Sequence, residues 1–208
     1  QDVFRTFGNS YFKAKLLKGL TFQTEFGMDY LSQNEEGYFR SETVRNQTTA
    51  VRGAGNNTGT FITNYNTNSY FSYNLAKEKH NLSATLGMQY QQSQAKYNST
   101  AGTDFPSNSY QKIASAATKS AGSSSQTDFR FLSYFLRANY SLMDKYIVAA
   151  SGRVDGSSRF GSAEKFGVFP GFSAGWKIHN EKFFKSLQEN SDLDFISFLK
   201  FRGGYGEI

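Results

Sequence analysis

A regular alternation of apolar and polar residues is the feature that most constrains what this chain can fold into. One face of residues 20–30 carries Leu20, Phe22, Thr24, Phe26, Met28 and Tyr30, and the residues between them are polar or small. The pattern recurs in residues 81–90, 132–140, 146–155 and 172–178. An amphipathic helix would instead repeat its apolar residues every three or four positions. The alternation therefore predicts strands with one apolar and one polar face.

The positions of these windows predict an all-β chain whose strands are joined by connections of two kinds. Eight strands are expected, over residues 10–17, 20–31, 60–75, 81–92, 129–140, 145–155, 166–178 and 198–207. Short connections would fall at residues 17–19, 76–80 and 141–145. Longer ones would fall at residues 32–59, 93–128, 156–165 and 179–197. The two longest are polar and low in complexity, which predicts loops, and the last is expected to hold a helical turn around Glu181–Leu187.

Alternation alone does not distinguish a soluble sandwich from a membrane barrel, because both have one apolar face. Two features favour the barrel. Tyrosine and tryptophan, which prefer the lipid–water boundary, gather near strand ends at Tyr11, Tyr30, Tyr90, Tyr140, Tyr146 and Trp176, with Phe12 beside them. Short and long connections also alternate, as in outer-membrane barrels. We therefore predict an antiparallel transmembrane β-barrel segment with outer-membrane lipid on its apolar face.

The two ends of the chain suggest a part of a larger barrel. Residues 1–10 have no basic start or apolar core, so no signal peptide is expected. No apolar run reaches the length of a transmembrane helix. The last residues, LKFRGGYGEI, still alternate at the end of the chain. The expectation is a barrel fragment.

The stretch from Phe131 to Trp176 carries a family resemblance. It contains a SYF-x-R-x-NY strand at Ser133–Tyr140, a DKY turn at Asp144–Tyr146, an R-x-DGSSRFG segment at Arg153–Gly161 and a strand ending in GW at Phe169–Trp176. In this combination and order the motifs resemble the barrel of SusC-like TonB-dependent transporters of the Bacteroidetes outer membrane. Gly171 departs from the pattern, because the family often has Ser there.

The resemblance implies a barrel of about 22 strands that encloses a plug domain. The eight predicted strands would be part of that one domain, and the plug is not in this sequence. It also implies outer-membrane, TonB-dependent import of a large nutrient, an oligosaccharide or glycan or a peptide. The implied partners are a SusD-like surface lipoprotein and, through the plug, the TonB complex.

Charged residues on the predicted polar faces are candidates for contact with substrate or plug. Arg137 and Arg153 lie on the polar faces of neighbouring strands. The alternative for them is an ion pair within the barrel, with Asp155, Asp29 or Glu25. The DGSSRFG segment could bind an anion, but the structural alternative is a tight turn in which Asp155 accepts hydrogen bonds from loop amides and Arg159 pairs with an acidic neighbour.

Aromatic residues in the predicted long loops are candidate sugar platforms, because loops often carry binding residues. The set is Tyr38, Phe39, Phe61, Tyr65, Tyr97, Phe105 and Tyr110, and of these Tyr97, Phe105 and Tyr110 are the chosen candidates. The alternative for each is ordinary packing within the loop.

No enzyme, cofactor or metal site is expected. The chain has no Cys and two His, which leaves no set of metal ligands. The GFSAG pentad at Gly171–Gly175 fits a nucleophile-elbow pattern but lies in an alternating strand. GAGNNTG at Gly53–Gly59 misses the dinucleotide-binding spacing.

Two other functions stay open at this point. One is a complete small eight-stranded outer-membrane barrel with an adhesin or structural role, because eight is an allowed closed number. The other is a basic nucleic-acid-binding β protein, suggested by the charge of +6 and a pI near 9.4. Its basic residues are scattered along the chain, so no nucleic-acid partner is expected.

Overall fold

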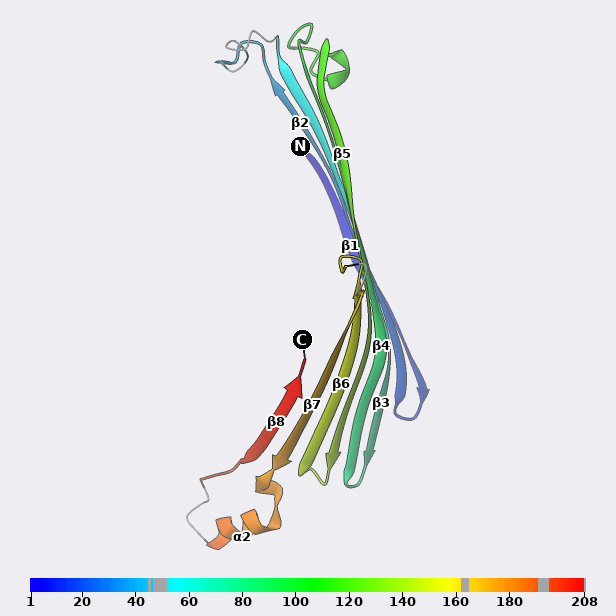
Figure 1. Cartoon of the computed structure of the whole chain (residues 1–208), viewed down its shortest axis with the longest axis vertical. Coiled ribbons are helices and arrows are strands. Elements are labelled where there is room, and N and C mark those ends of the chain that lie inside the picture. Colours follow the sequence, from blue (N-terminus) through cyan, green and yellow to red (C-terminus); the bar gives the residue numbers. More distant parts are fainter. Residues whose placement is uncertain (45, 47–51, 162–164, 191–194, 208) are drawn as a thin grey trace. The chain divides into compact units, whose positions relative to one another are not determined.

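The chain is an antiparallel sheet whose strands follow one another in sequence order, as predicted (Figure 1). The computed structural model describes residues 1–44, 46, 52–161, 165–190 and 195–207. The strands are β1 (Asp2–Leu17), β2 (Leu20–Phe39), β3 (Ala54–Lys77), β4 (His80–Thr103), β5 (Thr118–Leu142), β6 (Tyr146–Ser157), β7 (Phe166–Lys177) and β8 (Lys200–Gly206). They form one eight-stranded sheet in the order β1 to β8.

The predicted number of strands is confirmed, but five strand ends and both long loops were placed wrongly. β1 begins at Asp2 and not at residue 10. β2 continues to Phe39, β3 begins at Ala54, β4 continues to Thr103 and β5 begins at Thr118. The connections are therefore residues 40–53 and 104–117, far shorter than predicted. Polar, small residues extend these strands because backbone hydrogen bonds to a neighbouring strand need no apolar side chain. The predicted connections also include residues 45, 47–51, 162–164 and 191–194, which lie outside the described residues.

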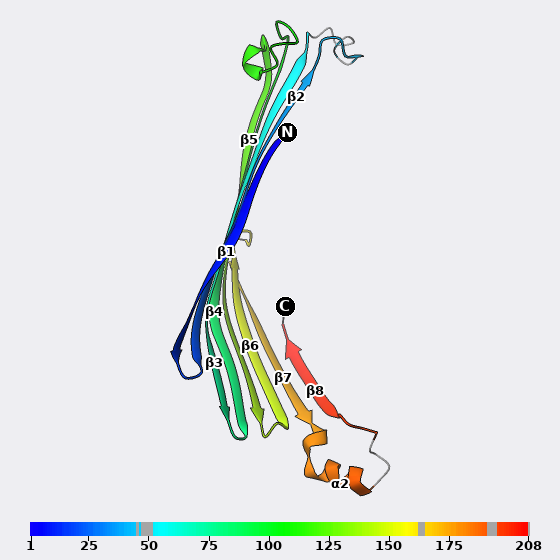
Figure 2. The ribbon, with the colours of Figure 1, turned by 180° about the vertical axis from the view of Figure 1, so that it is seen from behind.

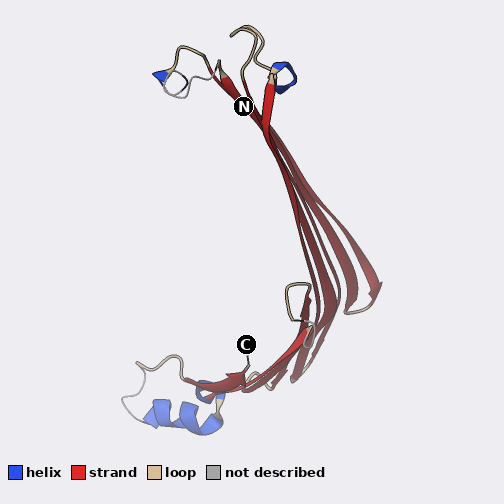
Figure 3. Cartoon of the chain, turned by 45° about the horizontal axis from the view of Figure 1, so that its top comes forward, coloured by secondary structure: helices blue, strands red, loops and turns tan. Residues whose placement is uncertain are grey.

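The helical segments lie in the connections between strands (Figure 3). A short 3-10 helix, η1 (Ile113–Ser115), follows β4, and η2 (Ile178–Asn180) follows β7. The α-helix α2 (Lys182–Asn190) comes next and confirms the predicted helical turn before β8. Within the described ranges, no helix is long and apolar enough to cross a membrane.

The chain divides into two compact units, which are described separately. Unit 1 comprises Gln1–Asn9, Gly27–Tyr65 and Gln92–Phe129. It holds the β2–β3 and β4–β5 connections. Phe105 is the most deeply buried of its described side chains, with 1% of its surface exposed. Unit 2 comprises Ser10–Phe26, Asn66–Gln91 and Arg130–Ile208.

In unit 2 the register of β5 to β8 aligns the predicted faces across all four strands. Apolar and small residues meet one another in the pairs Leu136↔Gly152, Ala138↔Ala150, Tyr140↔Val148, Ala150↔Phe172, Tyr146↔Trp176, Phe172↔Tyr205 and Trp176↔Phe201. Polar and charged residues meet in Ser133↔Asp155, Arg137↔Ser151 and Lys177↔Lys200. Side chains alternate along a strand, so this register gives one continuous apolar face and one polar face.

The short turns of unit 2 lie together at one end of its strands, seen from both sides in Figures 1 and 2. Gly19 in the first turn has φ +81°, and a side chain there would clash with the carbonyl oxygen of Asn74 in β3. In the third turn Met143 and Asp144 both have positive φ, which a tight hairpin requires. Backbone hydrogen bonds also link neighbouring turns, including Met143 N–H to the Lys79 carbonyl at 2.6 Å.

Candidate functional site: the polar face of the sheet

The polar face of unit 2 centres on an ion pair that the sequence predicted as one alternative. Arg153 Nε donates to Asp155 Oδ1 at 2.6 Å, and both residues come from β6. Ser133 of β5, which is fully buried, also donates its hydroxyl to Asp155. Arg153 Nη2 reaches Gln89 Oε1 of β4 at 3.3 Å. The charges of this pair are therefore matched within the sheet.

Arg137 differs from Arg153, because none of the described residues gives it a carboxylate partner. Its cross-strand partner on β6 is Ser151. It borders a hollow of about 310 Å³ whose lining takes in both faces of the sheet, with Ser151, Gly171 and Ser173 on the polar face and Phe172 and Tyr205 on the apolar face. A guanidinium that is surrounded by small side chains has room to donate hydrogen bonds to a carboxylate of another molecule or domain.

Two of the predicted acidic partners are wrong for both arginines. Asp29, in unit 1, pairs with Arg5 through two hydrogen bonds of 3.0 and 2.9 Å. Glu25 instead accepts hydrogen bonds from Gln23 at 2.7 Å and from the Tyr70 hydroxyl at 3.3 Å. Arg5 was missed because the first strand was predicted to begin at residue 10, whereas β1 begins at Asp2.

Aromatic rings also contribute to the polar face. Phe131 lies beneath the Arg153 guanidinium, 5.8 Å from its ring centre, which is a cation–π contact. Phe135, which interrupts the polar pattern of residues 132–140, packs over Gly87 of β4, where an added Cβ would lie 2.6 Å from the ring. The same Cβ would lie 2.6 Å from the Cβ of Tyr70. The alternation signalled Phe135 as an anomaly, but Phe131 and Gln89 were not singled out.

The DGSSRFG segment forms the end of β6 and the start of the β6–β7 connection. Asp155 does not cap the loop amides as predicted, because its carboxylate is taken up by Arg153 and Ser133. Ser157 takes the capping role and accepts the Arg159 N–H at 3.2 Å. The Ser158 hydroxyl accepts the Arg130 N–H at 2.9 Å, which ties the connection to β5. Arg159 itself is exposed.

The candidate aromatic residues separate into different environments. Tyr97 lies in β4 and not in a loop, and it is exposed; Tyr38, Phe39, Phe61 and Tyr65 are also strand residues. Phe105 is in a connection but is buried, with its ring edge-on to Tyr38 at 5.0 Å. This position supports the packing alternative for Phe105. Tyr110 is 62% exposed in the β4–β5 connection.

A second polar cluster lies at the turn end of unit 2, centred on Glu181. Its carboxylate accepts hydrogen bonds from Lys145 Nζ at 2.6 Å, the Tyr146 hydroxyl at 2.8 Å and Trp176 Nε1 at 3.2 Å. The hydrogen bond from Lys145, followed by the one from Tyr146, lowers the pKa of Glu181 to about 2. Nearby, the Lys177 ammonium, 2.5 Å from the carboxylate, lowers the pKa of Asp144.

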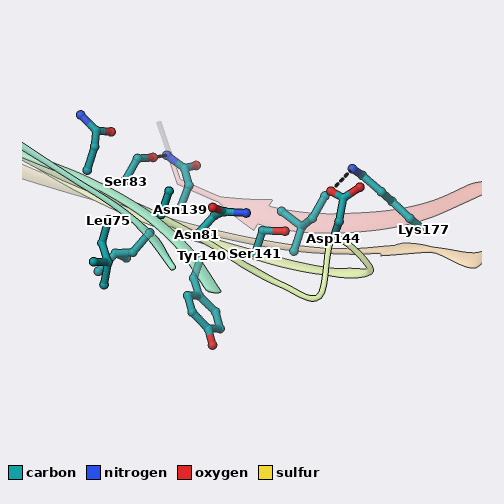
Figure 4. Close-up of a pocket in the computed structure, with 12 residues that line it drawn as sticks. Leu75, Asn81, Ser83, Asn139, Tyr140, Ser141, Asp144 and Lys177 are labelled. Atoms are coloured by element: carbon teal, nitrogen blue, oxygen red, sulfur yellow. Dashed lines mark hydrogen bonds and ion pairs between the residues drawn. The ribbon is translucent and has the colours of Figure 1, made fainter. Parts of the chain in front are cut away.

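A hollow of about 490 Å³ also lies near the turns (Figure 4). Asn139 donates to Ser83 at 3.3 Å across it, and Asp144 pairs with Lys177. Figure 4 shows Asn139 and Ser83 on one side of the ribbons and Tyr140 on the other. The lining therefore takes in both faces of the sheet, and we assign it no ligand.

The other predicted motifs carry no site. In the part of the chain that the structure describes, no group of three or more His, Asp and Glu could hold a metal. His80 meets the Tyr140 hydroxyl at 2.7 Å, and His179 meets the Leu199 carbonyl at 2.9 Å. GFSAG lies inside β7, as its alternation predicted, and Gly53–Gly59 forms the start of β3 from Ala54 onward, with no helix after it.

Comparison with known proteins agrees with this geometry. Residues 3–208 match the family described as "TonB dependent receptor-like, beta-barrel". The TonB-dependent receptor P39 of Formosa agariphila is 32% identical over 200 residues, which are 94% of this chain and 18% of the relative. The TonB-dependent receptor SusC of Bacteroides thetaiotaomicron is 44% identical over 75 residues, 36% of this chain and 7% of SusC.

Solved structures show the same fold. A structure of the RagAB peptide transporter superposes with a TM-score of 0.81 at 22% identity, over 97% of this chain and 23% of that chain. RagAB in its "closed-closed" state gives a TM-score of 0.83 at 21% identity, over 98% of this chain and 22% of that chain. The chain spans about a fifth of the length of the Formosa receptors it matches. The family's members are receptors, which bears out the expectation that the chain is not an enzyme. The two-faced antiparallel sheet and the match over nearly all of its length identify the chain as part of the outer-membrane β-barrel of the TonB-dependent receptor family, and specifically as SusC-like.

Proposed function

We propose that the whole protein imports a large nutrient, an oligosaccharide or glycan or a peptide, across the outer membrane in a TonB-dependent manner. This chain contributes part of the barrel wall and of the outer loops. The carrying observation is the register of β5 to β8, which separates an apolar face from a polar, charged face over four strands. A barrel in lipid with a wet interior requires that separation.

The proposed partners are a SusD-like surface lipoprotein and the TonB complex, the latter reached through a plug domain outside this chain. The likeness to SusC over 75 residues and the fold shared with RagAB support the lipoprotein partner. The name of RagAB describes a peptide transporter, while the resemblance to SusC leaves glycans equally open. Both substrate classes therefore belong in the test.

Among the candidate contact residues, we propose Arg137 as the main polar-face contact to plug or substrate. Its guanidinium has no carboxylate partner among the described residues, whereas Arg153 and Asp155 satisfy each other. Arg159, Tyr97 and Tyr110 are exposed and are proposed as outer contacts. Phe105 is proposed to act only through the shape of the loop that it supports, because its ring is buried.

The test is uptake by cells that carry the full-length receptor. A receptor-deletion strain should lose uptake of a fluorescent oligosaccharide or of a fluorescent peptide, and the complemented strain should regain it. Loss of neither, with normal receptor levels in the complemented strain, would contradict the proposal. Arg137→Gln should reduce uptake several-fold. Arg5→Gln is the control, because that guanidinium is already paired with Asp29, and it should leave uptake unchanged.

The alternative of a complete eight-stranded barrel has an observation against it. Closure would place β8 beside β1, but in the described sheet these strands stand at opposite ends of the order. No contact of the described residues favours the nucleic-acid alternative over the receptor.

A further inference from the structure

Helix α2, in the β7–β8 connection of unit 2, has an apolar side and a basic side. At 100° per residue, Phe183, Leu187 and Phe184 fall within one arc of about 100°, and Lys182, Lys185 and Glu189 fall on the remainder. Such a division marks a helix that lies between a wet and an apolar environment. Helix propensity alone does not explain this division into two sides in a helix of nine residues.

Only part of the apolar side is used inside the protein. Phe184 is 6% exposed, so it is packed against the chain. Phe183 is 50% exposed and Leu187 is 47% exposed. These two residues lie four positions apart, so their side chains are neighbours on one surface of the helix. The helix thus has one covered apolar edge and one bare one.

The bare edge continues the apolar face of the sheet. The ring of Phe183 lies 6.3 Å from the ring of Trp176, centre to centre. Trp176 stands on the apolar face of β7, opposite Tyr146 on one side and Phe201 on the other. In an outer-membrane barrel this face meets lipid, and a Tyr and Trp pair at strand ends marks the membrane boundary.

The start of the helix is held at this boundary by Glu181. Its carboxylate bonds Lys145, Tyr146 and Trp176, and its carbonyl accepts the Lys185 N–H of the first helical turn at 3.1 Å. The aromatic pair on the sheet and the first turn of α2 therefore share one anchor. This fixes the position of the bare edge relative to the apolar face within unit 2.

From this continuity we propose that α2 is an interfacial helix that lies in the phospholipid surface at the turn end of the barrel, the periplasmic side. Phe183 and Leu187 insert at the boundary of headgroups and acyl chains beside Trp176. Lys182 and Lys185 lie toward the lipid phosphates, as in other amphipathic helices at membrane surfaces. The proposal rests on the outer-membrane location and on the lipid-facing apolar face, and it does not depend on the substrate that is imported.

The test uses the full-length receptor reconstituted into phospholipid vesicles with brominated acyl chains. An environment-sensitive fluorophore is attached at Leu187→Cys on the bare edge, at Glu189→Cys on the polar side as the matched control, and at Phe172→Cys on the apolar face of β7. This chain has no Cys of its own, and any Cys elsewhere in the receptor is first replaced by Ser. The labels at positions 187 and 172 should be quenched several-fold more by bromolipid than the label at 189, and aqueous iodide should give the reverse order.

Two results would overturn the proposal and they are distinguishable. If the label at 172 is quenched by bromolipid but the label at 187 behaves like the one at 189, α2 does not enter the membrane. If the label at 172 is not quenched either, the lipid-facing assignment itself is wrong, and the proposed membrane role of this sheet falls with it. Should labelled Leu187→Cys fail to fold, Phe183→Cys carries the same label on the same edge.

Discussion

The two halves of β5 form one strand but differ in sequence pattern. Residues 118–128 read TKSAGSSSQTD and contain no large apolar side chain. Residues 132–140 alternate apolar and polar without a break except at Phe135. The first half belongs to unit 1 and the second to unit 2. Both halves are strand, so the alternation is not a requirement of the strand itself.

This difference between the halves of β5 shows that alternation indicates the surroundings of a strand's two faces. A strand whose faces meet lipid on one side and water on the other must alternate. A strand with water on both faces needs only the backbone bonds to its neighbour and residues small enough to tolerate an extended chain. We interpret the second half as the membrane-crossing part and the first half as strand outside the lipid.

The largest effect is expected from a charge on the apolar face of the second half. Leu136→Lys should destabilise the receptor by about 2–4 kcal/mol, because it places a cation in the hydrocarbon. Asn139→Lys on the polar face of the same strand loses one hydrogen bond to Ser83, worth about 1 kcal/mol. Refolding into lipid vesicles, read from the heat-modifiable shift on gels, measures both. Equal losses would contradict the assignment of the faces.

A smaller effect is expected from the packing of aromatic rings over glycine on the polar face. Gly87→Ala would bring a methyl group within 2.6 Å of the Phe135 ring and 2.8 Å of the Ser69 carbonyl oxygen. The backbone cannot yield easily, so overpacking should cost about 1–3 kcal/mol. Gly152→Ala is the control, because nothing lies within 4 Å of an added Cβ there. Denaturant unfolding should separate the two variants.

The acid sensitivity of the turn end should come from Glu181 and Asp144, whose carboxylates both have a lowered pKa, and chiefly from Glu181. Its pKa is lowered from 4.5 to about 2 by Lys145 and Tyr146, so its stabilising contribution is present above pH 4.5 and is lost as the pH falls to about 2. The unfolding temperature of the receptor in detergent should fall over this window. Glu181→Gln should reduce that dependence to the part that Asp144 carries, whereas Glu189→Gln, in the neighbouring helix, should keep it in full. A Glu181→Gln profile that matches wild type would refute the anchor.

Hydrogen exchange should show the subtlest contrast between the halves of β5. The register of β5 with β6 ends at Phe131, so residues 118–128 have only β4 beside them, whereas residues 132–142 lie between β4 and β6. In an antiparallel pair every second residue bonds a given neighbour. About half of the amides in 118–128 should therefore be protected, against nearly all in 132–142. Complete exchange of 118–128 would restore the loop that the sequence predicted.

These halves also explain how much of the fold the sequence could predict. Each of the eight strands was found where a membrane-type face imposed alternation, as in Leu132–Tyr140 and Tyr146–Val154. The extensions were missed at Asp2, Phe39, Ala54, Thr103 and Thr118, because pairing with a neighbour decides the structure there and leaves no periodic trace in the side chains. A deletion of residues 114–125, harmless for a loop, would remove eight residues of β5.

The sequence predicted which face of the sheet each candidate residue lies on better than it predicted which residues pair with each other. Alternation placed Arg137, Arg153 and Asp155 on one face, and the Arg153–Asp155 pair follows from their i, i+2 spacing in β6. Nothing local in the sequence shows that Ser133 and Gln89 complete that pair, because they come from β5 and β4 and meet it only through the register. For the same reason Asp29 could not be assigned to Arg5 before β1 was known to begin at Asp2.

The sequential strand order has a consequence for how the sheet forms. Every strand from β2 onward pairs with the strand that precedes it in the chain, so no pairing within the sheet has to wait for a distant segment. Low contact order of this kind lowers the entropy cost of each closure. The sheet can therefore grow by the addition of one hairpin at a time to the edge strand already in place. The strands can then pair in the same order in which they follow one another along the chain.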